Sequence, residues 1–258
     1  INLNFATFTD GIDFVFPAVD LGPRQHVLVV EDPNAFASKY GGGLPVIGRY
    51  LGRLANGGER ITLVDAAGQT IHDFKYKDGW YDVTDEEGFS LTIIESQNPD
   101  PNSWGEKDAW RASTYPGGSP GTDDSGILPL PGAIVINEVL AHSHDAESDW
   151  VELHNTTDSA VAIGGWFLSD RKTNLAKYEI PAGTTIAPNG YFVLHEQANF
   201  GHDSKDPHSH EGFALSENGE TVYLTSALGG QFAGYRESQD FGASETSVSL
   251  GRYHKQST

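Results

Sequence analysis

Short runs of alternating apolar and polar residues recur along the chain, and clusters of Gly, Pro, Asn and Asp separate them. The clearest runs are HVLVV (26–30), RITLV (60–64), AIVINEVL (133–140), VELH (151–154), YFVLH (191–195) and TVYLT (221–225). Such runs, with turn residues roughly every 8–12 positions, are typical of strands in sandwiches and barrels. The pattern predicts an all-β chain, and only residues 34–41 favour a short helical turn.

The stretch DWVELHN (149–155) combines this alternation with a carboxylate. In a strand, Trp150, Glu152 and His154 share one face, and the side chains between them share the other. We interpret Glu152 as a structural group at the edge of a sandwich, where it accepts hydrogen bonds. A catalytic role would need two carboxylates facing one cleft, and a raised pKa would favour it.

The chain also resembles itself. The matching pairs, in order, are FVFP (14–17) with YEIP (178–181), PRQHVLVVEDPNAF (23–36) with PNGYFVLHEQANF (188–200), LANGGERITL (54–63) with LSENGETVYL (215–224), GQTIHDFKY (68–76) with GGQFAGYRE (229–237), and GFSLTI (88–93) with SVSLGR (247–252). Five matches in one order indicate an internal repeat. In this register Ile1 corresponds to about Val161, so residues 133–160 have no counterpart in the first copy.

The two copies are separated by a stretch rich in Gly, Pro, Ser and Asp, which predicts an ordered or semi-rigid linker. The predicted organisation is a first domain at 1–116, a linker at 117–132 and a second domain at 133–254.

The ordered motifs of the second copy carry a resemblance to a known family. These are INEVL (136–140), DWVELHN, VAIGGWFLSD (161–170), IPAGTTIAPNGYFVL (180–194) and FALSENGETVYL (213–224). Together they resemble the lamin tail domain, and the bacterial secreted or surface type in particular. The resemblance implies two tandem immunoglobulin-like β-sandwiches, the first without its first two strands. Either preceding residues or a partner segment would then complete the first sandwich.

Composition narrows the class of function. The formal net charge is -20, so the chain is expected to repel nucleic acid. No apolar run is long enough to span a membrane, so no direct membrane insertion is expected. Cysteine is absent, which excludes disulfides and thiolate metal sites. The chain begins at Ile1 and contains no Met, and we interpret it as a piece of a longer protein.

Two segments rich in His and Asp are candidate metal sites. The candidate ligands are His142, His144, Asp145 and Asp149 in the first segment, and His202, Asp203, Asp206, His208 and His210 in the second. A His-x-His pair on an extended segment presents both imidazoles on one face, which suits Zn²⁺, Ni²⁺ or Cu²⁺. The carboxylates suit Ca²⁺. Neither segment has a defined ligand spacing, so solvated polar loops are the alternative.

The aromatic residues Trp80, Tyr81, Trp104 and Trp110 gather late in the first copy. Exposed together, they could stack on sugars, but such residues more often close a core. No nucleophile, P-loop, zinc-protease or dinucleotide motif is present, so no enzyme is predicted.

The resemblance implies a non-catalytic binding, adhesion or spacer module of a larger extracellular or cell-surface bacterial protein. Its expected partners are proteins or glycans of a cell surface or matrix. The alternatives are a module that binds a divalent metal such as Ca²⁺ or Zn²⁺, and an accessory domain of a secreted hydrolase, which could bind carbohydrate.

Overall fold

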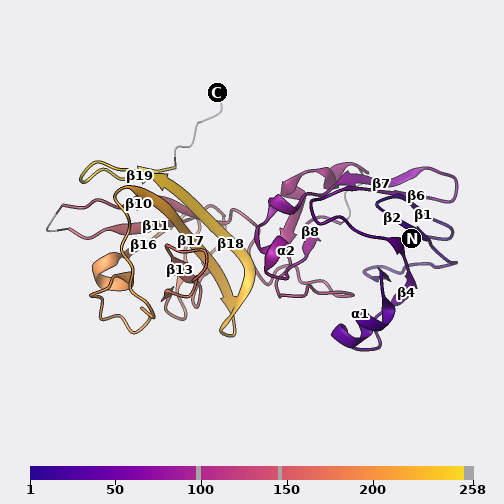
Figure 1. The fold of residues 1–258 in the computed structure, drawn as a ribbon, viewed down its shortest axis with the longest axis horizontal. Coiled ribbons are helices and arrows are strands. Elements are labelled where there is room, and N and C mark those ends of the chain that lie inside the picture. The colour runs from indigo at the N-terminus through magenta and orange to yellow at the C-terminus, as the bar shows by residue number, and fades with distance from the viewer. Residues whose placement is uncertain (97–99, 145–146, 253–258) are drawn as a thin grey trace, which may run out of the picture. The chain divides into compact units, whose positions relative to one another are not determined.

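A computed structural model describes residues 1–96, 100–144 and 147–252 (Figure 1). The chain divides into two compact units, unit 1 (1–127) and unit 2 (128–258). This boundary falls inside the segment that the sequence predicts to be a linker. Within the described residues most regular structure is β-strand, which confirms the all-β prediction. No helix in the described part of the chain has the length and hydropathy to cross a membrane.

Unit 1 contains a five-stranded antiparallel sheet in the order β5-β2-β1-β6-β7. The strands are β1 (Thr7–Asp10), β2 (Ile12–Val15), β5 (Leu51–Gly52), β6 (Arg60–Val64) and β7 (Thr70–Lys75). The turn from β1 to β2 depends on Gly11, which has a φ of 88°. A Cβ at this position would meet the Ile61 side chain at 2.4 Å, so only glycine fits here.

The remaining elements of unit 1 form two smaller pairs. Strands β3 (Leu28–Val30) and β4 (Val46–Arg49) are parallel, and helix α1 (Pro33–Tyr40) connects them. Asp32 caps α1 by accepting hydrogen bonds from the Asn34 and Ala35 amides at 2.8 and 3.1 Å. Strands β8 (Leu91–Ile93) and β9 (Trp110–Ala112) are antiparallel. Short helical turns precede them: η1 (Asp78–Trp80), α2 (Val83–Glu86), η2 (Ser103–Gly105) and η3 (Lys107–Ala109).

Unit 2 is a sandwich of two four-stranded sheets (Figure 1). The first sheet has the order β16-β11-β10-β19, with β10 (Ile134–Leu140), β11 (Trp150–Asn155), β16 (Tyr191–His195) and β19 (Leu250–Gly251). The second has the order β14-β13-β17-β18, with β13 (Phe167–Ser169), β14 (Tyr178–Glu179), β17 (Gly219–Leu228) and β18 (Gln231–Gly242). A small pair, β12 (Val161–Ala162) and β15 (Thr185–Ile186), and the π-helical turn η4 (Glu196–Phe200) complete the unit.

Strand β11 alternates as its sequence predicts. Its burial follows a strict two-residue period, with Val151 and Leu153 buried and Trp150, Glu152 and His154 half-buried. Asn155 continues the buried face of the strand. The buried face joins one core cluster that includes residues of both sheets. Burial of each such aliphatic side chain contributes about 1.5–3 kcal/mol to folding.

A tyrosine connects the two sheets at the start of β10. The Tyr235 hydroxyl in β18 donates to the Ile134 carbonyl at 2.6 Å and accepts from the Ile134 amide at 2.8 Å. Both residues are buried, since Tyr235 is 5% and Ile134 0% exposed. This pair of hydrogen bonds holds the first strand of unit 2 on the opposite sheet.

Much of the segment predicted to be a linker packs on unit 1. Asp124 is 3% exposed, and its carboxylate pairs with the buried guanidinium of Arg111. The carboxylate also accepts a hydrogen bond from the Thr114 amide at 2.7 Å. Burial raises the pKa of Asp124, but the hydrogen bonds from Arg111 and Thr114 outweigh it and hold that pKa below its ordinary value. This end of the segment is therefore a structural part of unit 1.

Candidate functional site

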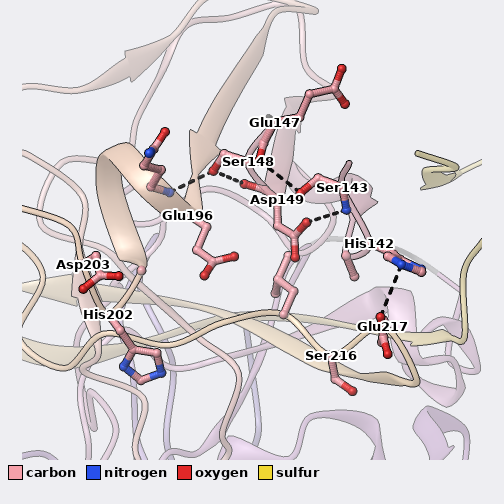
Figure 2. Close-up of a pocket in the computed structure, with 14 residues that line it drawn as sticks. His142, Ser143, Glu147, Ser148, Asp149, Glu196, His202, Asp203, Ser216 and Glu217 are labelled. Atoms are coloured by element: carbon pink, nitrogen blue, oxygen red, sulfur yellow. Dashed lines mark hydrogen bonds and ion pairs between the residues drawn. The ribbon is translucent and has the colours of Figure 1, made fainter. Parts of the chain in front are cut away.

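A polar pocket of unit 2 lies where three loops meet at one end of the sandwich (Figure 2). Its volume is about 650 Å³. One loop joins β10 to β11, the second follows β16, and the third precedes β17. Since β10, β11 and β16 are neighbours in one sheet, the loops at this end of the sheet lie close together.

The first loop is held in place by its own polar side chains. Asp149 is 9% exposed, and its carboxylate accepts a hydrogen bond from the Ser143 amide at 2.9 Å. The Ser148 hydroxyl donates to the Asp149 carbonyl at 3.2 Å and accepts from the Gln197 amide at 2.9 Å. The second of these bonds connects the first loop to η4, so two of the loops that line the pocket are held to each other.

The second loop brings a half-buried carboxylate into the pocket. Glu196 follows β16 directly, and its carbonyl accepts from the Gly201 amide at 2.7 Å to close the π-turn. A Cβ at Gly201 would meet this carbonyl oxygen at 2.6 Å, which explains the glycine. Burial raises the pKa of Glu196, the Asp149 carboxylate raises it further, and His202 opposes the rise.

The imidazole of His142 connects the first loop to the rest of unit 2. Its Nε2 lies 3.1 Å from the Thr246 hydroxyl and 3.4 Å from the Glu217 carboxylate. Its Nδ1 lies 3.2 Å from the Ser244 carbonyl. Both ring nitrogens therefore have protein partners, and a metal ion would have to displace one of them.

The structure brings together part of the residue set that the sequence predicts for a metal. His142, Asp149, His202 and Asp203 line the pocket, and they come from both predicted segments. His144 is exposed and does not line the pocket, while Asp145 lies outside the described residues.

The other three predicted ligands form hydrogen bonds and ion pairs around the neighbouring loop. Asp206 accepts hydrogen bonds from the Tyr178 hydroxyl at 3.0 Å and from the His208 amide at 2.9 Å. The His210 ring lies 3.2 Å from the Glu179 carboxylate, and the His208 carbonyl accepts from the Glu179 amide at 2.9 Å. Burial raises the pKa of Asp206, but its hydrogen bonds hold it below the ordinary value. These contacts indicate a structural role.

No three or more His, Asp or Glu side chains of the described residues are arranged to hold a metal ion. The metal site therefore stays a prediction. The sequence pattern missed several pocket residues, namely Glu147, Ser148, Glu196 and Glu217. The position of Glu196 directly after the YFVLH strand was a usable signal, because a residue just past a strand lies among the end loops.

Glu152, the carboxylate of the DWVELHN stretch, has a structural environment. It accepts a hydrogen bond from the Asn137 side-chain amide at 2.8 Å. Its cross-strand neighbour is Glu138, whose carboxylate accepts from the Ser249 hydroxyl. Each carboxylate thus has a hydrogen-bond donor in unit 2, which agrees with the structural interpretation of Glu152.

The aromatic residues of unit 1 contact one another. Trp80 is 8% exposed, and Tyr81, Trp104 and Trp110 are half-buried. The Trp104 and Trp110 rings meet edge to face with centroids 6.0 Å apart, and Trp110 Nε1 donates to the Trp104 carbonyl at 2.7 Å. This packing favours the core interpretation over an open row of sugar-stacking rings.

Comparison with known proteins supports the resemblance of the second copy. Residues 129–238 match the family model described as Lamin Tail Domain. The match supports an immunoglobulin-like β-sandwich and a non-catalytic domain family for this part of the chain. No curated protein matches the chain, and no solved structure matches it either.

The Glu196–Asp149 pair is the feature of the pocket that resembles a catalytic acid–base site. Two neighbouring carboxylates, one with a raised pKa, are what acid–base chemistry on a sugar would use. Burial is the first cause of the rise at Glu196, and the Asp149 carboxylate is engaged by a backbone amide. Together with the non-catalytic family match, this favours binding over catalysis.

Proposed function

We propose that the chain is a non-catalytic binding module of a larger extracellular or cell-surface bacterial protein. The loop-end pocket of unit 2 receives a positively charged group of its partner. The lamin tail match over residues 129–238 supports a binding or spacer role. Binding surfaces are commonly formed by loops that a rigid scaffold holds in place, and this pocket is built in that way.

The charge of the pocket lining carries the proposal. No Lys or Arg is among the residues that line the pocket. Five carboxylates line it: Glu147, Asp149, Glu196, Asp203 and Glu217. The raised pKa of Glu196 reports the burial and the like charge at this site. A cation entering the pocket would relieve that repulsion and gain attraction from several carboxylates.

Titration calorimetry with tetralysine as the probe tests this function. We expect binding that weakens as salt rises, because partly exposed charges are screened. The Glu217→Gln variant should weaken binding by about three-fold, the scale of one exposed charge pair. Asp158→Asn is the matched control, because this exposed carboxylate lies just past the opposite end of β11. Equal effects of the two variants would refute a specific pocket.

A divalent cation is the second candidate occupant of the same pocket. The observation that favours it is that His142, Asp149, His202 and Asp203, from two sequence segments, line the same pocket; no three of them are placed to hold an ion together in the described residues, so side chains would have to move to bind it. Thermal unfolding of the chelator-treated chain with Ca²⁺ or Zn²⁺ tests it, since a ligand that binds the native state raises the midpoint. A rise lost in Asp203→Asn but kept in Asp158→Asn would support the metal. An unchanged midpoint with both ions would rule it out.

The tandem arrangement belongs to the same proposal. In the repeat register, the counterparts of β1, β2, β6 and β7 in unit 1 are β13, β14, β17 and β18 in unit 2. The strand order β2-β1-β6-β7 then corresponds to β14-β13-β17-β18, and every pairing in both is antiparallel. Unit 1 is thus proposed to be a second lamin-tail-like copy, one sheet of which corresponds to the β14-β13-β17-β18 sheet of unit 2.

A further inference from the structure

A lysine and an aspartate are in contact inside unit 2. Lys177 is 3% exposed, and its Nζ lies 2.8 Å from Oδ1 of Asp170. The Nζ also lies 5.6 Å from the ring centroid of the buried Phe213 and 3.3 Å from Oε1 of Glu211. The Glu211 side chain is 54% exposed, whereas that of Asp170 is 15% exposed. The lysine amine therefore has one largely buried carboxyl partner, Asp170.

The strand pairing explains why these two side chains meet. Asp170 directly follows β13, and Lys177 directly precedes β14, which pairs with β13. The loop between them returns the chain to the same end of this strand pair. The Lys177 carbonyl accepts hydrogen bonds from the His210 and Glu211 amides at 2.8 and 3.1 Å. The backbone on both sides of the contact is thus held in place.

The contact lacks the hydrogen bonds that normally stabilise a buried ion pair. Asp170 Oδ1 is buried and accepts no hydrogen bond from the described residues, although Lys177 Nζ is close. Desolvation of two charges is offset only where hydrogen bonds satisfy both groups. Transfer of one proton from the ammonium to the carboxylate would remove both charges. It would leave a neutral amine beside a carboxylic acid, and these are the forms that react with each other.

A third carboxyl, that of Glu220 in β17, lies in the same region. Ser169, the last residue of β13, pairs with Tyr223 of β17. Asp170 therefore lies beside the part of β17 that holds Glu220. Because side chains alternate along a strand, Glu220 shares a face of β17 with the fully buried Val222. The Glu220 carboxyl is thus on the face of β17 that meets the core.

Glu220 interacts electrostatically with both members of the pair. Burial raises the pKa of Glu220, and the hydrogen bond from the Ser216 amide opposes the rise. The Asp170 charge raises this pKa further, and the Lys177 charge lowers it. A carboxyl that is near both groups and has a raised pKa can take a proton from one of them and return it to the other.

We propose that Lys177 and Asp170 condense to an amide, which cross-links the chain inside unit 2. The Nζ lone pair attacks Asp170 Cγ, and an N–Cγ bond forms. One proton passes from the nitrogen to the Glu220 carboxylate, which gives it to the departing hydroxyl group. The Cγ–O bond breaks with its electron pair on oxygen. The products are the amide and one water molecule, so the step needs no oxidant, reductant or co-reactant.

The fold supplies the conditions for this reaction. Well-oriented groups within one molecule react as if each were present at about 10⁵–10⁸ M. The Lys177 amine and the Asp170 carboxyl meet this requirement, since both are held at the ends of paired strands. Burial also keeps bulk water away from the amide once it has formed. The cross-link closes the loop of residues 171–176 and ties β14 to β13.

The mass of the intact full chain, measured after denaturation, tests the proposal. The cross-linked chain is lighter than its sequence mass by one water molecule, whereas an ion pair leaves the mass unchanged. We expect this loss in the unsubstituted chain and the full mass in Lys177→Arg. In a tryptic digest, the peptide that ends at Arg171 should be joined to the one that contains Lys177. Full mass in the unsubstituted chain would overturn the proposal, and so would a water loss that persists in Lys177→Arg.

Variants of the two carboxyl groups nearest Nζ identify the one that reacts. Asp170→Asn should lose ammonia in place of water, because the amide nitrogen is then the leaving group. Asp170→Ala should keep its full mass. Glu211→Gln is the matched control, since Glu211 also contacts Nζ but is exposed, and it should still lose water. Loss of ammonia from Glu211→Gln would place the bond at Glu211 and overturn the proposal.

The Glu220→Gln variant tests the proton transfer. Mass spectra recorded at successive times after cell-free synthesis should show condensation slowed by about 100-fold or more, the scale of general acid–base catalysis. A glutamine keeps an acceptor for the Ser216 amide, so amide exchange in β17 should stay unchanged. Condensation at the original rate would overturn the role of Glu220. The tetralysine titration reports on the loop-end pocket, so failure of either proposal is distinguishable from failure of the other.

Discussion

Removal of the buried carboxylate of Asp124 should destabilise unit 1 strongly. The Asp124→Ala variant leaves the guanidinium of Arg111 buried at 6% exposure without its charged partner. It also removes the acceptor of the Thr114 amide. Breaking a buried ion pair from one side costs about 3–5 kcal/mol, because the remaining charge stays desolvated. We expect a loss of this size in the free energy of unfolding of unit 1.

Urea unfolding read by pulsed hydrogen exchange and mass spectrometry measures this loss for each unit through its own peptides. With a slope of roughly 2 kcal/mol per molar urea, the midpoint of unit 1 should fall by roughly 1.5–2.5 M. The matched control is Asp73→Ala, which breaks an exposed Arg60–Asp73 pair on the same unit. Its midpoint should move far less, because solvent and salt screen an exposed pair.

A small shift for Asp124→Ala, equal to that of the control, would refute the reasoning. It would mean that unit 1 does not depend on burial of this pair. The double variant Arg111→Met with Asp124→Leu gives a second check, because it removes both charges and should recover much of the stability. The direction in which the stability of unit 1 changes with pH also follows from this pair. The lowered pKa of Asp124 stabilises unit 1 above the unfolded pKa near 4, and this contribution is lost as pH falls through the folded pKa.

Three further predictions concern unit 2. Tyr235→Phe should cost about 1–3 kcal/mol in urea unfolding, because it leaves the buried Ile134 amide and carbonyl without their partner; an unchanged midpoint would contradict this. Asn155→Ala should cost a similar amount, about 1–3 kcal/mol, since its buried amide donates to three carbonyls at 2.8–3.0 Å. A loss of stability in Thr157→Ala, whose hydroxyl donates to Asn155, but none in Asn155→Ala would contradict this. Glu196→Gln should raise the thermal midpoint at pH 7 but not near pH 4: a raised pKa makes the charged form destabilising, so stability falls as pH rises through the window from the unfolded to the folded pKa. A larger gain at the acidic pH would contradict the sign.

The strands could be predicted from the sequence because their signal is local. A strand half-buried in a sandwich must alternate along its own residues, and β11 shows this with Val151 and Leu153 inward. The predicted runs 60–64 and 191–195 coincide with β6 and β16. The absence of a counterpart for residues 133–160 in the first half could also be read by comparing the chain with itself.

Only the tertiary structure decided which polar residues share a site. Asp203 and Asp206 look equivalent in the sequence, yet Asp203 lines the pocket while Asp206 accepts a hydrogen bond from Tyr178. Likewise, nothing local marks Asp124 in its Gly- and Pro-rich segment as the partner of Arg111. Strand alternation is set by each residue's immediate neighbours. The grouping of loop residues depends instead on which strands lie side by side in the sheet, and that is fixed by long-range packing.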